Sequence, residues 1–324
     1  MKLGSAIGGA APQWDAEVLA RVAWLQLRAR QAVTGLIHGA HRSVQIASNV
    51  EFAEYKEYSP GDPLRDLDWR VAARSDRLVV RRHRAESDLP VIIVFDASGD
   101  MSTGEGGLGR PPLQGSKFGY SVTLAASLAW FLSHRGEPVG LLIAGGEEPH
   151  SGGVRPPRWP YIPARTGETH LVQLLAALAA LRPAGQANLG RAFEETGQRM
   201  RRRGVVAVVS DLMEEPTTWG PSLSALARRQ ADLRVVHLHD EREWAFDFKA
   251  PARFWSPEGG EPLPLDPNDV REALPEVLRE YLAEVRGWLA GNRAVHVLTP
   301  TRLPLELALA RVLRGHAGDP PRAP

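Results

Sequence analysis

The sequence predicts an α/β protein built on a doubly wound, mostly parallel sheet, and three observations point to this class. Short runs rich in β-branched residues alternate with longer segments of helical composition from residue 91 to residue 314. The runs at 91–95 and 205–209 are apolar at every position, which is typical of strands buried on both faces. Glycine- and proline-rich stretches separate the segments. Parallel strands that alternate with helices form an open sheet covered by helices.

The N-terminal part of the chain is expected to contain a loose end followed by one helix. The first residues are small and rich in glycine and alanine, which gives them little to pack. From Trp14 to Ile37 the composition becomes helical, and apolar residues such as Val18 and Val22 share one face. We therefore assign residues 1–37 to an N-terminal loose end and helix.

The next segment, residues 38–87, is expected to be a β-rich extension. Short alternating apolar runs lie on either side of the turn sequence Pro60-Gly61-Asp62. Proline fixes φ and glycine permits a positive φ, so this sequence is typical of a tight turn. Alternation with such punctuation predicts short strands. A structural role is favoured here over a catalytic one.

Residues 88–314 form the predicted main domain. Its strands are expected at 91–95, 139–144, 205–209, 233–238 and 294–298. Its helices are expected at 117–134, 168–182, 188–202, 221–231, 267–290 and 304–314. The glycine- and proline-rich stretch that ends at Thr166 is expected to form a loop or an edge hairpin. The tail, residues 315–324, has a composition typical of disorder.

Two acidic residues directly follow the two most apolar strands. Asp96 follows the run VIIVF, and Asp211 follows the run VVAVVS. Both are therefore expected at the carboxyl edge of the sheet, where open α/β sheets bind their ligands. In the sequence Asp96-x-Ser98-x-Asp100, carboxylates and a hydroxyl form a ligand set that suits Mg²⁺. The same residues would equally serve as loop acids that cap the next turn, and periodicity alone leaves both interpretations open.

The Asp96-x-Ser98-x-Asp100 sequence resembles the metal-ion-dependent adhesion site of von Willebrand A domains, whose pattern is Asp-x-Ser-x-Ser. Asp211 resembles the later acidic residue of that family. The resemblance implies a von Willebrand A-like, Rossmann-type fold and a possible Mg²⁺ cofactor held by these four residues. It also implies that a partner's carboxylate completes the shell of the ion. Two positions depart from the pattern, because Asp100 replaces the second serine and Ala187 replaces the threonine of a separate loop.

Residues from about 35 to 300 resemble, more specifically, the family called domain of unknown function 58. The matching stretches are Gly39-Ala-His-Arg-Ser43, Glu51-Phe52-Ala-Glu54-Tyr55, Tyr58-Ser-Pro60-Gly61-Asp62, Arg65-Asp-Leu-Asp68-Trp69 and Ala72-Ala-Arg74. Its most distinctive residues here are Pro60, Gly61, Asp62, Arg65, Asp68, Trp69 and Arg74, which we interpret as a structural motif. The resemblance implies frequent association with MoxR-type AAA+ ATPases, in systems connected with the assembly or activation of other proteins.

These observations predict a non-enzymatic protein-interaction or adaptor module. The docking site would be the carboxyl edge of the sheet, formed by Asp96, Ser98, Asp100, Asp211 and Asn188. The expected partner is a MoxR-type AAA+ ATPase or its client. If no metal is bound, the aspartates would favour a lysine or arginine of the partner. The alternative is a Mg²⁺-dependent phosphohydrolase that uses Asp96 as nucleophile or metal ligand.

Composition limits the remaining possibilities. The chain has no cysteine, which excludes disulfides, thiolate metal sites and a cysteine nucleophile. Its net charge of +1 favours neither nucleic acid nor membrane as a partner. The apolar stretches at 122–132 and 171–181 are shorter than the roughly 20 residues of a spanning helix, so we expect a cytoplasmic protein without membrane insertion.

Two further sets of residues are interpreted as structural. The basic runs at 81–84 and 201–203 lack interleaved aromatic residues, so a nucleic-acid adaptor is the weakest of the functional hypotheses. His237 and His239 alternate on one predicted strand and would face the same side, but no further ligand with suitable spacing accompanies them.

Overall fold

The computed structural model of this chain describes residues 16–39, 55–57, 79–81, 89–102, 116–146, 160–229, 231–246, 252–254, 258 and 263–314. The predicted turn and structural motif between Pro60 and Arg74 lie outside these residues, as do the predicted loose end and the predicted tail.

The centre of the fold is a six-stranded sheet in the order β10-β7-β6-β3-β4-β5. Its strands are β3 (Val91–Ala97), β4 (Val139–Gly145), β5 (Tyr161–Arg165), β6 (Gly204–Ser210), β7 (Ala231–His239) and β10 (Val295–Pro300). All neighbours are parallel except β4 and β5, which are antiparallel. The predicted mixed α/β architecture with a mostly parallel sheet is therefore confirmed. The stretch before Thr166 contributes the edge strand β5.

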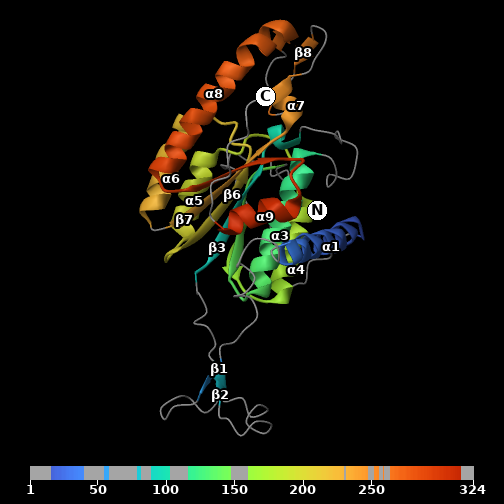
Figure 1. Cartoon of the computed structure of the whole chain (residues 1–324), viewed down its shortest axis with the longest axis vertical. Helices are drawn as coiled ribbons and strands as arrows, with labels where there is room; N and C mark the ends of the chain where they lie inside the picture. The colour runs from blue at the N-terminus through green and yellow to red at the C-terminus, as the bar shows by residue number, and fades with distance from the viewer. Residues whose placement is uncertain are drawn as a thin grey trace, which may run out of the picture.

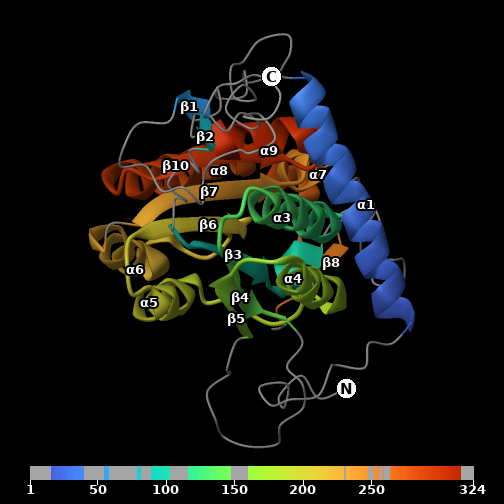
Figure 2. The same cartoon turned by 90° about the horizontal axis from the view of Figure 1, so that it is seen from below.

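Helices cover both faces of this sheet (Figure 2). One face packs against α1 (Ala16–Gly39), α3 (Lys117–His134), α4 (Glu168–Ala180) and α9 (Leu305–Arg314). The other packs against α5 (Leu189–Arg199), α6 (Pro216–Arg228) and α8 (Pro267–Gly291). Successive strand residues point to opposite faces, so Ile93 and Phe95 enter the first core while Ile92 and Val94 enter the second. Burial on both faces is why this strand carries no polar residue before Asp96.

The N-terminal helix α1 is part of the main core. Val22, Leu25, Val33 and Leu36 follow one face of the helix and are buried in the same cluster as the sheet. The helix packs against α3, α4 and α9. Residues 1–37 were predicted as a segment separate from the main domain. The helix α1 instead closes one face of that domain.

Smaller elements complete the described part of the chain. In the predicted β-rich segment, β1 (Tyr55–Glu57) pairs antiparallel with β2 (Val79–Arg81). A hairpin is formed by β8 (Ala252–Phe254) and β9 (Leu263–Leu265). A 3-10 helix, η5, spans Gly99–Ser102, and a short helix, α7, spans Glu241–Ala245 beside α8 (Figure 1). Within the described ranges, every helix is too short or too polar to cross a bilayer.

The largest difference between a predicted and an observed helix boundary is at the start of α6. The sequence predicts that the helix after β6 starts at residue 221, but α6 begins at Pro216. Proline suits the first helical position, because the N–H it lacks would have no partner there. Pro221 lies inside the helix instead of starting it.

Candidate functional site

Asp96 and Asp211 meet at the carboxyl ends of two adjacent parallel strands. Asp96 lies near the end of β3, and Asp211 follows the last residue of β6. From β3 the chain continues outward to β4 and β5, whereas β6 starts the other half of the sheet. In open α/β sheets, ligands bind beyond the strand ends at such a reversal of strand order. Both side chains are buried there, with 2% and 3% of their residue surface exposed.

Asp96 is held by two hydrogen bonds. Its Oδ1 accepts from the backbone N–H of Ser98 at 2.8 Å, and its Oδ2 accepts from the hydroxyl of Ser210 at 2.5 Å. Burial raises the pKa of Asp96 to about 7, and the charge of Asp211 adds to this, while the bonds from the two serines lower it. The carboxyl group is therefore fixed in position and titrates near neutrality.

A buried lysine that the sequence analysis did not single out contacts Asp211. Lys117 is the first residue of α3 and is only 1% exposed. Its Nζ donates to Asp211 Oδ2 at 2.6 Å and to Glu243 Oε1 at 2.9 Å. Burial lowers the pKa of Lys117, but the two carboxylates outweigh burial and raise it above its ordinary value. The lysine is therefore a charged ammonium between two acids.

The sequence did contain a signal for Lys117. Apart from His134, it is the only acidic or basic residue in α3, whose remaining residues are small, apolar or hydroxylic. A helix without a polar face is a buried helix. A cation in the first turn opposes the helix dipole, and a buried lysine requires a charged partner. These arguments would have predicted an ion pair, although not the identity of Glu243.

Asp100 lies at the outer rim of the site. It belongs to η5 and is half-buried. Burial raises the pKa of Asp100, with a further contribution from Asp211, while Lys117 opposes the shift. Burial, followed by the charges of Asp100 and Asp96, raises the pKa of Glu258 to about 7. These carboxyl groups therefore lie close enough to influence one another, which gives the edge an acidic character.

Asn188 starts α5 rather than projecting freely from a loop. It has a left-handed conformation, with φ of 48°, and its side chain accepts from the N–H of Arg191 at 3.2 Å. The next N–H, that of Leu189, donates to Glu214 Oε1 at 2.9 Å. Ala187, at the position where the resemblance implies a threonine, is buried. This loop therefore places a capped helix N-terminus against Glu214, which lies between β6 and α6, and it carries no hydroxyl at position 187.

Met213 is an exposed apolar residue beside these acids. It follows Asp211 by two positions, and its N–H donates to Asp211 Oδ1 at 3.2 Å. Its surface is 55% exposed. The backbone turns outward at Leu212, which has φ of 54° and whose carbonyl accepts from the Tyr281 hydroxyl of α8. The edge thus presents one large apolar side chain next to several carboxyl groups.

The possible Mg²⁺ site can be compared with this geometry. Of the predicted ligands, Asp96 accepts two internal hydrogen bonds, and both oxygens of Asp211 also accept hydrogen bonds. An ion bound to Asp211 Oδ2 would share that oxygen with the ammonium of Lys117, which would repel it. Among the described residues, no three His, Asp or Glu side chains are arranged as a metal site. The magnesium site stays a prediction.

The two histidines of β7 belong to a neighbouring cluster. His237 Nδ1 lies 3.2 Å from His296 Nε2, and the ring of His239 stacks on Trp244 at 3.9 Å between ring centroids. Burial lowers the pKa of His239 and that of His296 to about 4. These histidines are therefore neutral at physiological pH and serve packing.

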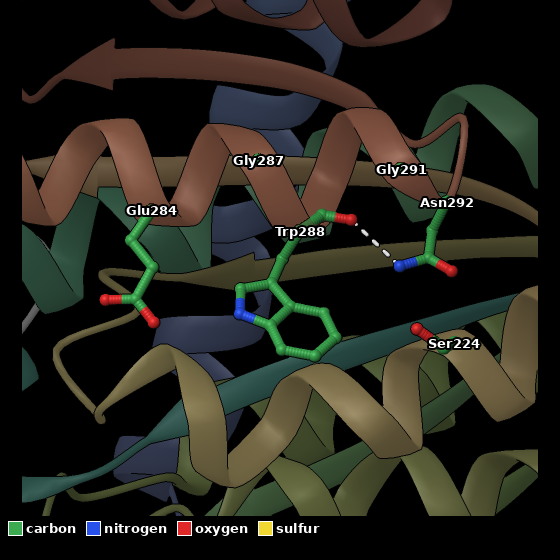
Figure 3. A pocket seen from close by; sticks show the side chains of 6 residues that line it. All are labelled: Ser224, Glu284, Gly287, Trp288, Gly291 and Asn292. Carbon is green, nitrogen blue, oxygen red and sulfur yellow. Dashed lines mark hydrogen bonds between the residues drawn. The ribbon is translucent and has the colours of Figure 1, made fainter.

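A pocket of about 420 Å³ lies between α6 and α8 (Figure 3). It is lined by Ser224, Glu284, Gly287, Trp288, Gly291 and Asn292. Because α8 ends at Gly291 and β10 begins at Val295, the pocket lies toward the amino-terminal edge of the sheet, away from the acids. Trp288 packs closely on Gly220, where an added Cβ would lie 2.4 Å from the indole ring. We therefore interpret the region as helix packing.

Comparisons with other proteins agree with the family resemblance. The family described as "Protein of unknown function DUF58" matches residues 54–281. Uncharacterized proteins of Mycobacterium tuberculosis and Mycobacterium bovis are 30% identical over 232 residues, which cover 71% of this chain and 67% of theirs.

Two solved structures are similar at 13% identity, and each comparison covers 70% of this chain and 98% of the other. They are the conserved hypothetical protein BatB of Bacteroides thetaiotaomicron, with a TM-score of 0.43, and an aerotolerance-related membrane protein of Bacteroides fragilis, with a TM-score of 0.44.

Proposed function

Since this chain belongs to the DUF58 family of proteins of unknown function, we propose that it is a non-enzymatic interaction module that acts with a MoxR-type AAA+ ATPase. The family resemblance supplies the ATPase as the expected partner. The carboxyl edge of the sheet supplies the surface on which the ATPase, or a client protein, would dock. The proposal includes a cytoplasmic location.

The fold assignment behind the proposal is a von Willebrand A-like, Rossmann-type domain. Numbered in chain order, the six strands lie in the order 3-2-1-4-5-6, which is the doubly wound order. The acid and serine of the adhesion motif, Asp96 and Ser98, come at the end of the first of these strands. The later acid, Asp211, follows the fourth strand. Topology and motif positions support the same assignment.

The observation that carries the proposal is the exposed Met213, which lies two residues after Asp211 and directly before Glu214 at the carboxyl edge. Protein interfaces are enriched in methionine and aromatic residues at their centres and carry polar groups around them. Here Asp100, Glu214 and Glu258 provide half-buried carboxyl groups at the same edge. We infer a partner surface that offers an apolar pocket flanked by lysine or arginine, since opposite charges speed encounter and set orientation.

The phosphohydrolase alternative has less support from the same contacts. A nucleophilic Asp96 would have to reach a substrate, but its residue surface is only 2% exposed and each of its oxygens accepts an internal hydrogen bond. Lys117, the cation that could stabilise a phosphoryl group, is buried between Asp211 and Glu243. Turnover of a generic phosphate ester that disappears in Asp96→Asn would revive this alternative.

The proposal is tested by measuring binding to a MoxR-type ATPase from the same organism by calorimetry. Met213→Asp places a charge at the proposed anchor and is expected to weaken binding about tenfold or more. Leu27→Asp is the matched control, because Leu27 is also 55% exposed but lies on α1. Equal loss in both variants, or in neither, would contradict docking at this edge, and no binding by the wild-type chain would remove the ATPase as partner.

A further inference from the structure

Lys117 contacts one of the four residues that were predicted to hold a divalent ion. Its ammonium touches Asp211, the predicted ligand that follows β6, and also Glu243 of α7. We propose that Lys117 is a built-in cation that takes the place of a metal ion and assembles the carboxyl edge without one. This inference deepens the proposed function and rests on it for the role of the edge, but its tests require no partner protein.

The ammonium of Lys117 joins separate parts of the fold. Lys117 belongs to α3, Asp211 follows β6, and Glu243 belongs to α7, so one ammonium joins three separate elements. Its Nζ lies within 3.1 Å of three carboxylate oxygens, two of which belong to Glu243. The Oγ of Ser116 accepts from Gly119 N–H at 3.0 Å and fixes the helix turn that carries the lysine. Metal ions commonly join elements in this way through several oxygen ligands.

The charge of Lys117 is compensated by the carboxylates around it. An isolated ammonium would be very costly to bury, whereas two carboxylates in direct contact offset that cost. A divalent ion on the same Asp211 carboxylate would lie within a few ångströms of the ammonium and would be repelled by it. Lys117 and a metal ion are therefore alternatives at this carboxylate.

The side chain of Lys117 is shielded from solvent. Lys117 is 1% exposed. An ion from solvent could take the place of its ammonium group only if α3 or α7 moved. Whereas binding through a metal depends on the free concentration of that metal, an edge assembled by a covalently attached cation is permanently formed. The docking edge is consequently expected to bind its partner equally well in the presence and absence of divalent ions.

The first experiment titrates Mg²⁺ and Mn²⁺ into the wild-type protein by calorimetry, up to millimolar concentrations, and compares melting temperatures with and without a chelator. The expected result is no saturable heat and no change in melting temperature. Saturable binding that is lost in Asp211→Asn would overturn the proposal. This measurement uses the wild-type chain and so does not depend on whether a variant folds.

The second experiment compares two variants at the same position. Lys117→Ala removes the charge and leaves space, so the carboxylates are expected to bind an added divalent ion, raising the melting temperature by about 5 °C at a hundred times the Kd. Lys117→Met removes the charge but fills the space, and should respond much less. If neither variant responds to Mg²⁺, Mn²⁺ or Ca²⁺ while folded, the lysine does not stand in for a metal.

These tests separate the inference from the proposed function. If the wild-type protein binds a metal at Asp211, Lys117 is not the cation of the site, yet docking at Met213 is still measured independently with the ATPase. If docking fails but Lys117→Ala acquires a cation response, the inference about the charge of the site holds and the partner is wrong.

Discussion

Two buried polar clusters lie side by side in this protein, and they meet the cost of burial in opposite ways. At the carboxyl edge, Lys117 remains charged between Asp211 and Glu243. In the neighbouring strands β7 and β10, His237 and His296 form a hydrogen-bonded pair. Burial lowers the pKa values of both histidines, so both remain neutral. The clusters are adjacent, because His237 is the register partner of Ser210 in the sheet. The difference shows that a contacting opposite charge decides whether a buried group keeps its own charge.

The largest expected effect is the loss of the charged pair. Lys117→Met leaves two carboxylates facing each other without a cation and is expected to lower the free energy of unfolding by about 3–5 kcal/mol. Urea denaturation, monitored by circular dichroism, would measure this change in the free energy of unfolding.

The double variant Lys117→Met/Asp211→Asn provides the control. Removing both charges leaves one carboxylate, that of Glu243, in place of two around the position of the lost ammonium, so the double variant should be less destabilised than the sum of the two single variants. Simple additivity would show that the ion pair is not coupled and would weaken the comparison between the clusters.

The second effect concerns the pH dependence of stability. The pKa of Asp96 is about 7 in the folded protein, above its ordinary value of 3.8, so the folded state holds this proton more tightly. The stability contributed by the proton is present below pH 3.8 and is lost as the pH rises through 7. Asp96→Asn should therefore gain about 2 kcal/mol relative to wild type between about pH 5 and about pH 8.

The difference between wild type and variant is the quantity to measure, by melting temperature or urea denaturation at each pH. His239 and His296 have lowered pKa values, so their contribution is present above pH 6.5 and is lost as the pH falls toward 4. That trend opposes the effect of Asp96 and is common to both proteins. A pH-independent difference between them would contradict the raised pKa of Asp96.

The smallest expected effect is on the neutral cluster. His296→Leu removes the partner of His237 Nδ1 and should cost about 1–2 kcal/mol, because an uncharged group left without a hydrogen bond is less costly than an uncompensated charge. His134→Leu is the matched control, since that histidine makes its hydrogen bond at an exposed position. Destabilisation by His296→Leu as large as that of Lys117→Met would contradict the distinction between the clusters.

Much of the fold could be predicted because local patterns determined it. The apolar runs at 91–95 and 205–209 became β3 and β6, and the helix predicted at 117–134 has those limits. Asp96 and Asp211 follow strands that are adjacent and parallel, so their meeting at one edge followed from topology alone. Boundaries next to proline were less predictable, as α6 shows, because the same residue can start a helix or lie inside it.

The contacts of the site were decided by tertiary structure. Lys117 and Glu243 are 126 residues apart, and Glu243 lies in a five-residue helix too short to give a periodic signal. The sequence by itself determined the long strands and helices of the main domain and which acids end at the carboxyl edge, because these depend on composition and periodicity within a few turns of chain. Only the packing of α3 and α7 around the end of β6 brings Lys117 within hydrogen-bond distance of Asp211 and Glu243. That contact depends on how distant elements are placed, and no local pattern encodes it.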